Sequence, residues 1–115
     1  MKYEFTLCAG RHETPASQAI FEEIADPTDF EGMINRANEV IPADADELVV
    51  YVTGLTPAML AVTKLCWLNG ISLTAMHYDR ETGKYLPQQV LKFETCSSCG
   101  RRYPAFLSAC PACWG

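Results

Sequence analysis

Four cysteines in the last twenty residues constrain this chain more than any other feature of its sequence. They form two Cys-x-x-Cys pairs, Cys96 with Cys99 and Cys110 with Cys113, and ten residues separate the pairs. Each pair can turn two thiolates toward one point, and the intervening segment can form a short hairpin that joins the pairs. Four sulfurs about 2.3 Å from one ion make the closed tetrahedral site of structural zinc. The spacing therefore predicts a zinc site made by these four cysteines.

This C-terminal segment, CSSCGRRY followed by CPAC, resembles a zinc ribbon, and it is also similar to rubredoxin-type iron centres. Thiolates suit either ion. Zinc is favoured because nothing else in the chain looks like a redox partner, and iron would instead indicate an electron carrier. A segment this short cannot bury a core, so the metal must supply its stability. The metal module either only stabilises the structure or presents a docking surface. The residues of that surface are Arg101, Arg102, Tyr103, Phe106 and Trp114.

Charge is distributed unevenly along the 115 residues. Residues 1–90 hold 6 Lys and Arg against 13 Asp and Glu, whereas residues 91–115 hold 3 against 1. An acidic body argues against broad, nonspecific DNA binding. The apolar runs are too short for a membrane span, and the start lacks the long apolar region of a signal peptide, so we expect a cytoplasmic protein. Cys8 and Cys66 lie in apolar runs and are expected to be buried small hydrophobes.

Hydrophobic patterning and capping residues predict alternating strands and helices. Thr14 with Pro15 is expected to open a first helix, and a capping box of Thr28 and Glu31 a second. The third expected helix is apolar on nearly all sides, which predicts that it is buried. The expected strands are residues 3–8, 48–53, 71–77 and 84–90, and the expected helices are residues 14–24, 30–41 and 57–69.

This order of elements predicts the fold class. The strand, helix and strand within residues 48–77 make a βαβ unit, which crosses over right-handedly. We therefore expect a small three-layer α/β domain of Rossmann-like type over residues 1–92, with a mostly parallel sheet. Residues 93–115 form the four-cysteine zinc ribbon, and residues 91–95 link the two parts.

A ligand in such a sheet binds beyond the carboxyl ends of the strands. Gly54 follows a buried strand, and Thr56 then opens a helix whose N–H groups can face a phosphate. The alternative is that Gly54 and Thr56 only shape the chain. Arg11 in the first strand-end loop suits an anionic group, although this loop can equally be a solvated charged turn.

Both histidines, His12 and His77, belong to the same predicted edge. His77 ends a strand and is followed two residues later by Asp79, so the pair could act as a general base with its orienting carboxylate. The alternative is that His77 is merely hydrogen-bonded. Arg80 in the same loop could neutralise phosphate charge.

Two stretches resemble a known group of proteins: VYVTGLTPA at residues 50–58 and HYDRETGKY at residues 77–85. They are similar to small Rossmann-like proteins of CRISPR-associated and phage neighbourhoods, among them CARF domains and compact ring nucleases. The resemblance covers about residues 45–90. It implies a homodimer that binds or degrades cyclic oligoadenylate. It places Thr53, Gly54 and Thr56 at a ligand phosphate, with His77 and Arg80 as further site residues.

Two functional hypotheses follow. In the first, the Rossmann-like domain binds a nucleotide-type ligand such as a cyclic oligonucleotide and cleaves it with His12 or His77 as the proton carrier. Arg11 or Arg80 then neutralises the phosphates. In the second, the protein is a non-enzymatic adaptor that dimerises through the α/β body and docks a protein or nucleic acid through its ribbon.

Overall fold

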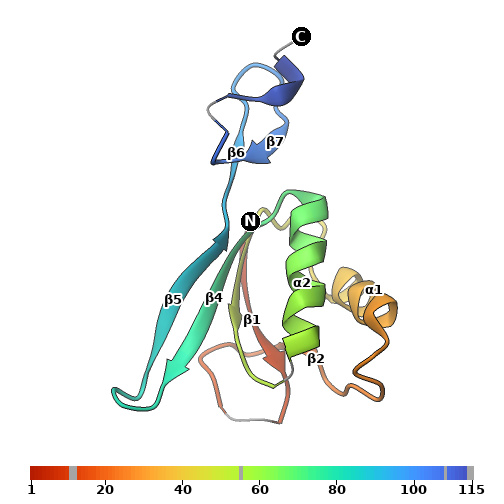
Figure 1. Cartoon of the computed structure of the whole chain (residues 1–115), viewed down its shortest axis with the longest axis vertical. Coiled ribbons are helices and arrows are strands. Elements are labelled where there is room, and N and C mark those ends of the chain that lie inside the picture. The colour runs from red at the N-terminus through yellow and green to blue at the C-terminus, as the bar shows by residue number, and fades with distance from the viewer. Residues whose placement is uncertain (11–12, 55, 108, 114–115) are drawn as a thin grey trace.

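A computed structural model of the chain describes residues 1–10, 13–54, 56–107 and 109–113, and it consists of an α/β body from which a small ribbon projects (Figure 1). The body contains β1 (Lys2–Cys8), β2 (Ala19–Phe21), α1 (Phe30–Val40), β3 (Glu47–Tyr51), α2 (Thr56–Asn69), β4 (Ser72–Asp79) and β5 (Lys84–Leu91). The ribbon contains β6 (Phe93–Thr95), β7 (Arg102–Pro104) and a 3₁₀ turn over Pro111–Cys113.

The body is built on a five-stranded, mostly parallel sheet with the strand order β2-β1-β3-β4-β5. The first four strands are parallel to one another, and β5 returns antiparallel to β4. The predicted α/β class and the mostly parallel sheet are confirmed. The strand expected at residues 48–53 is β3, which ends two residues earlier, at Tyr51.

Both helices cover the same face of the sheet, so the prediction of three layers is wrong for the described residues (Figure 1). Right-handed crossovers that run in opposite directions along a sheet lie on opposite faces. The connections that contain α1 and α2 run in one direction and share a face. The β1–β2 connection runs in the other direction and crosses the opposite face, where Thr14 bonds to Thr6 and the Glu13 carbonyl accepts from Tyr85.

The missing third layer is the helix expected at residues 14–24, and that prediction is also wrong. These residues form a loop and then the short edge strand β2, in which Thr6 pairs with Ala19 and Cys8 with Phe21. The side chains of Ile20 and Phe21 are buried in the core. Pairing with β1 satisfies the main chain here, which overrides the helix-start signal of Thr14 and Pro15.

The predicted helix at residues 30–41 is confirmed, but its start differs from the predicted capping box. Asp29 is the N-cap, and its side-chain oxygen accepts a hydrogen bond from the N–H of Gly32 at 3.0 Å. The hydroxyl of Thr28 instead bonds to Asp26. Both Thr28 and Asp29 suit an N-cap position, and the path of the entering chain decides between them.

The core lies between the two helices and the sheet. Its fully buried side chains include Leu7, Leu48, Val62 and Leu73. The prediction that Cys8 and Cys66 are buried is confirmed, and burial raises the pKa of the Cys66 thiol to about 12. Neither helix of the described chain has the length and apolar character that crossing a bilayer would require.

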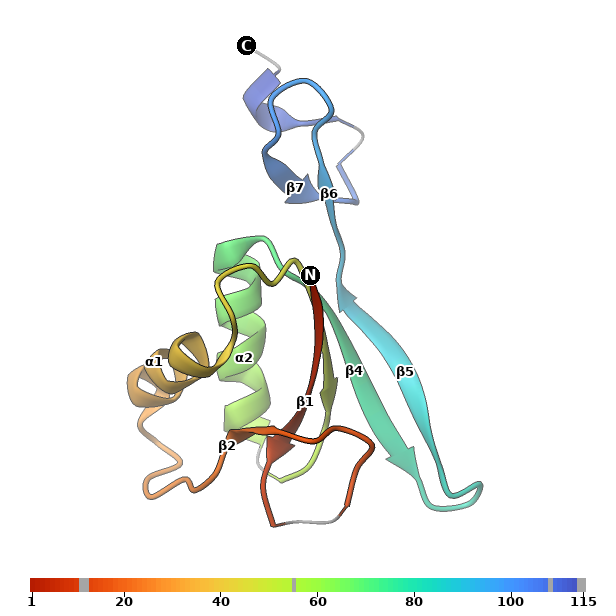
Figure 2. The same ribbon diagram turned by 180° about the vertical axis from the view of Figure 1, so that it is seen from behind.

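The ribbon extends beyond the N-terminal end of the parallel strands, as seen from both sides of the molecule (Figures 1 and 2). Its strands β6 and β7 are antiparallel and pair Phe93 with Pro104 and Thr95 with Arg102. Residues 93–95, expected as part of a linker, are therefore the first strand of the ribbon.

Candidate functional site

The four C-terminal cysteines meet at one point, at the end of the ribbon. Their Sγ atoms all lie within 4.8 Å of one another. Cys96 Sγ lies 3.6 Å from Cys113 Sγ, and Cys99 Sγ lies 3.6 Å from Cys110 Sγ. Ligands 2.3 Å from a tetrahedral zinc ion are about 3.8 Å apart, whereas a disulfide would require about 2 Å. These two separations are thus close to the edge of a metal-centred tetrahedron, and all four sulfurs lie near enough to share one ion.

Backbone N–H groups around Cys96 favour the thiolate form of its side chain, which is the form that binds a cation. The N–H groups of Cys99 and Ser98 point at this sulfur and lower the pKa of the Cys96 thiol to about 6. The turn is closed by a hydrogen bond of 2.9 Å from the Gly100 N–H to the Cys96 carbonyl. Gly100 has φ +75°, a conformation that glycine adopts without strain.

The second pair contains a thiol, that of Cys113, whose pKa is shifted in the opposite direction to that of Cys96. The 3₁₀ turn over Pro111–Cys113 brings the Cys113 N–H to the Cys110 carbonyl at 3.1 Å. Interaction with the sulfurs of Cys96 and Cys99 raises the pKa of the Cys113 thiol to about 12. Four crowded sulfurs cannot all be thiolates without a positive charge among them. A divalent cation removes this conflict, so the residues present fit zinc.

Arg102 fastens the ribbon to the body, a role that sequence reasoning did not find. Its Nε donates to the Gly70 carbonyl at 3.0 Å, and its Nη2 donates to the Asp46 carbonyl at 2.9 Å. Its Nη1 donates to the Thr95 hydroxyl at 3.1 Å. Arg102 was expected, with its neighbours, on an outward docking surface. In the structure its guanidinium binds the chain's own loops before β3 and before β4.

Apolar contacts reinforce this junction. The ring of Phe93 is buried and lies 5.7 Å from the ring of Trp67, centre to centre. The Phe93 N–H also donates to the Ser72 hydroxyl at 2.9 Å. Gly70 allows the close approach, because a Cβ at this position would lie 3.1 Å from Cβ of Arg102. The ribbon is thus held on the body by both polar and aromatic contacts.

The predicted strand-end edge contains an open hollow of about 600 Å³. It is lined by Glu13, Val52, His77, Tyr78 and Arg80. Two of the predicted site residues, His77 and Arg80, therefore share one surface depression. Arg11 and His12, which were predicted to bind and to act on the same ligand, lie outside the described residues.

The predicted dyad of His77 and Asp79 is not formed. The Nε2 atom of His77 lies 2.7 Å from Oε1 of Gln88, across the β4–β5 pair. The carboxylate of Asp79 accepts from the Glu81 N–H and from the Thr82 hydroxyl, so it caps the β4–β5 turn. The His77 ring is thus bound to a side chain of β5 and not to Asp79.

Thr53 follows β3, and its side chain hydrogen-bonds to the end of the neighbouring strand β1. From these two strands the chain continues in opposite directions along the sheet. The Thr53 hydroxyl donates to the Cys8 carbonyl at 2.8 Å and accepts from the Cys8 N–H at 3.1 Å. The side chain is only 1% exposed. Gly54 and Thr56 are exposed beside it, with Gly54 at φ +90° where the chain turns toward α2. In this structure the Thr53 hydroxyl serves the main chain, and its role at a ligand phosphate stays a prediction.

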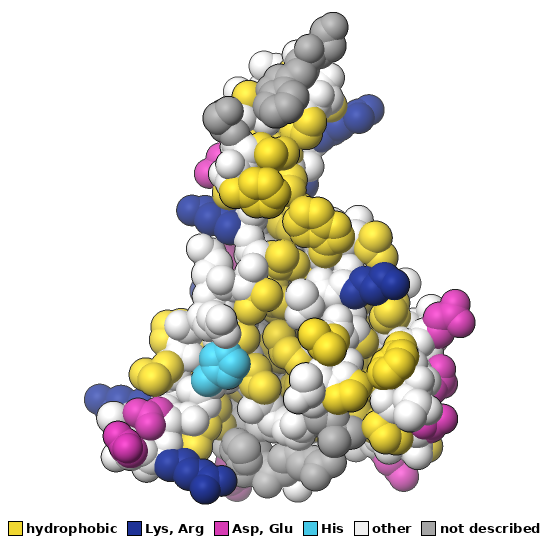
Figure 3. Space-filling model, in the orientation of Figure 1, with side chains coloured by type: hydrophobic (Ala, Val, Ile, Leu, Met, Phe, Trp, Pro, Cys, Tyr) yellow, Lys and Arg dark blue, Asp and Glu magenta, His cyan; other side chains and the backbone are white. Residues whose placement is uncertain are grey.

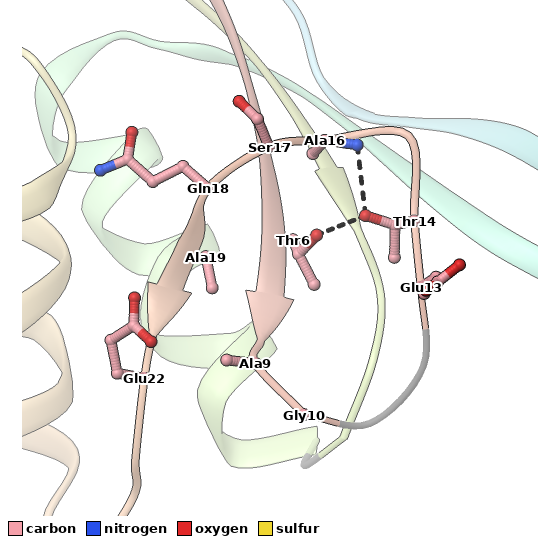
Figure 4. Close-up of a pocket in the computed structure, with 10 residues that line it drawn as sticks. All are labelled: Thr6, Ala9, Gly10, Glu13, Thr14, Ala16, Ser17, Gln18, Ala19 and Glu22. Atoms are coloured by element: carbon pink, nitrogen blue, oxygen red, sulfur yellow. Dashed lines mark hydrogen bonds between the residues drawn. The ribbon is translucent and has the colours of Figure 1, made fainter.

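A second hollow, of about 410 Å³, lies under the β1–β2 connection (Figure 4). The side chains of Ala9, Ala16, Ser17 and Ala19 line it and leave it open because they are small. The carboxylates of Glu13 and Glu22 lie at its sides. Figure 4 shows the connection passing in front of β1, with the helices behind the sheet.

Comparison of the chain with protein-family models, with curated proteins and with solved structures found no match to any of them.

Proposed function

We propose that the four C-terminal cysteines bind one zinc ion, which closes the ribbon and makes it a rigid extension of the α/β body. The observation that carries this proposal is the pair of 3.6 Å sulfur separations, which match the edge of a tetrahedral zinc–thiolate site. The ribbon has three-residue strands and Phe93 as its only buried residue besides Cys110 among those described. Its stability therefore comes from the metal and from the contacts with the body.

We further propose that the protein is a non-enzymatic adaptor. Arg102 and Phe93 hold the ribbon against α2 and the loop before β4, so that ribbon and body present one surface to a partner. Several large apolar side chains of α2 are exposed, with Trp67 and Leu68 in the last turn next to this junction and Leu60 further along the helix. Large apolar groups at a surface, close to one another, are typical of interaction sites.

Elemental analysis of the purified protein tests the metal. We expect one zinc ion per chain in the wild type and in the matched control Ser98→Ala. Cys99→Ser should lose the zinc and unfold the ribbon, while circular dichroism of the body persists. A red, iron-loaded protein from zinc-replete cells, or protein without metal, would contradict the proposal.

A second candidate function is the binding of a nucleotide-type ligand, such as a cyclic oligonucleotide, at the strand-end hollow. The observation that favours it is the meeting of Arg80, His77 and the half-exposed ring of Tyr78 in one depression. A guanidinium can bind phosphate, and an aromatic ring can stack on a base. We propose binding alone, because Asp79 is engaged in its own turn and does not orient His77.

Calorimetry with cyclic oligonucleotides and mononucleotides tests this second function. Arg80→Ala should weaken binding at least about tenfold, the usual loss for a charged phosphate contact. Lys84→Ala removes the same charge from the neighbouring strand and should leave the affinity nearly unchanged. An absence of heat across the whole ligand panel would leave the adaptor as the remaining hypothesis.

A further inference from the structure

An exposed apolar stripe runs along α2 on the side away from the sheet. We define the α2 stripe as Leu60, Lys64, Trp67 and Leu68, whose spacing of three and four residues places them on one helix face. Leu60 and Leu68 are 64% and 65% exposed, and Trp67 is 47% exposed. In Figure 3, yellow side chains are spread across the helix-bearing front face. The prediction that this helix is buried is wrong at this stripe, because the described chain has no layer above α2.

The stripe continues into a groove between α1 and α2. The groove has a volume of about 300 Å³, and its lining residues are Phe30, Ile34, Pro57, Leu60, Ala61 and Lys64. Ala61 is almost fully buried, whereas Phe30 is 56% exposed. A small side chain between large exposed ones leaves space for an apolar anchor from a partner.

The apolar area matches a protein interface of ordinary size. Half-exposed Phe and Trp rings and two-thirds-exposed Leu side chains together present roughly 400–500 Å² of apolar surface. A specific interface buries about 800 Å² on each partner, of which about 60% is apolar. The α2 stripe with Phe30 therefore supplies most of the apolar part of one such interface.

The position of Lys64 argues against a second copy of this chain as the partner. Lys64 lies midway between Leu60 and Leu68, and in the described part of the chain it has no ion pair, since those found there join Met1 to Asp46 and Arg36 to Glu39. A two-fold axis through the middle of the stripe would bring Lys64 against its own copy, whether the helices run parallel or antiparallel. Like charges at an interface are unfavourable. This disfavours a second copy of the chain as the occupant.

We propose that the α1–α2 groove and the α2 stripe bind an amphipathic helix of a partner protein, with apolar anchors on one face and a carboxylate opposite Lys64. The inference rests on the adaptor function proposed above and names its partner class. Helices with anchors spaced by three and four residues bind in apolar grooves of this kind. The carboxylate pairs with the one cation at the centre of the stripe, and the anchors cover Leu60, Trp67 and Leu68.

Synthetic amphipathic peptides of about 18 residues test the proposal. Three peptides share the same leucine face and differ only in a central Glu, Gln or Lys. Fluorescence anisotropy with the full-length, zinc-replete protein should show that the Glu peptide binds about three- to tenfold more tightly than the Lys peptide. Lys64→Glu should reverse this order, and Leu60→Asp should weaken the binding of all three. Lys84→Glu, remote from the groove, is the matched control and should keep the wild-type order.

Two results would overturn the proposal. One is binding of the three peptides with equal affinity, or no binding at all. The other is a wild-type dimer in analytical ultracentrifugation that Leu60→Asp dissociates, since the occupant would then be a second copy. If Leu60→Asp fails to fold, the charge reversal with Lys64→Glu decides alone. Zinc content is measured on the same samples, so a failure of the metal proposal is seen independently of peptide binding.

Discussion

Replacing Arg102 by alanine should weaken the attachment of the ribbon to the body without emptying the metal site. The side chain donates to the carbonyls of Gly70 and Asp46 and to the hydroxyl of Thr95, at distances between 2.9 and 3.1 Å. A hydrogen bond contributes about 0.5–1.5 kcal/mol net, and exposed ones lie at the low end. One of the three bonds is partly buried and two are exposed, so we expect a loss of about 2 kcal/mol.

Thermal unfolding and hydrogen exchange measure this loss. For 115 residues the entropy of unfolding is about 0.24 kcal/mol/K, so 2 kcal/mol lowers the melting temperature by about 8 °C in a single cooperative transition. The Phe93 amide, which donates to Ser72, should exchange faster. Zinc content should stay at the wild-type value, because Arg102 contributes no ligand.

Arg101→Ala is the matched control, because it removes the same charge from the neighbouring, exposed residue. Surface substitutions of this kind change stability by less than about 0.5 kcal/mol. Equal stability of the Arg102→Ala and Arg101→Ala proteins, with unchanged exchange at Phe93, would refute the reasoning. Arg102→Lys should recover only part of the loss, since an ammonium cannot reach three acceptors in the fork geometry of a guanidinium.

Three further predictions follow from the same structure. Thr53→Val should lower the free energy of unfolding by about 1–3 kcal/mol, because two buried hydrogen bonds to the end of β1 are lost. Thr53→Ser keeps the hydroxyl and should retain most of the stability. Equal urea midpoints for the two variants would contradict this prediction. Asp29→Ala should cost about 1 kcal/mol as an N-cap, with a smaller effect for Thr28→Ala, and the reverse ranking in urea unfolding would support the capping box instead. Zinc should protect Cys96 and Cys113 from alkylation near pH 7, whereas removal of the zinc should expose both thiols, because the ribbon then loses the ion that stabilises it. Mass spectrometry of the alkylated peptides measures this protection, and equal labelling with and without zinc would contradict the metal site.

Local sequence patterns were sufficient for most of the secondary structure. The continuous apolar run of β3 and the apolar stripe of α1 are properties of consecutive residues, so periodicity and capping chemistry locate them within one or two positions. The cysteine cluster is equally local. Two turns and a short hairpin within residues 96–113 bring Cys96, Cys99, Cys110 and Cys113 together.

The errors fall where a segment had two local options and a distant contact chose between them. Residues 14–24 carry a helix-start signal, yet pairing of Ala19 and Phe21 with β1 makes a strand. The apolar composition of α2 indicated burial on all sides, but burial depends on what covers a helix, and the described chain places no layer above Leu60 and Leu68.

The sequence by itself determined the cysteine cluster and most of the strands and helices of the body, because both depend on residues close together in the chain. Only the tertiary structure decided the roles of Arg102 and Thr53. Their partners are set by the approach of distant loops at Gly70 and Asp46 and by the reversal of strand order beside Cys8. A polar side chain bonds to whichever group the fold brings within about 3 Å, and the residue type alone does not specify that group.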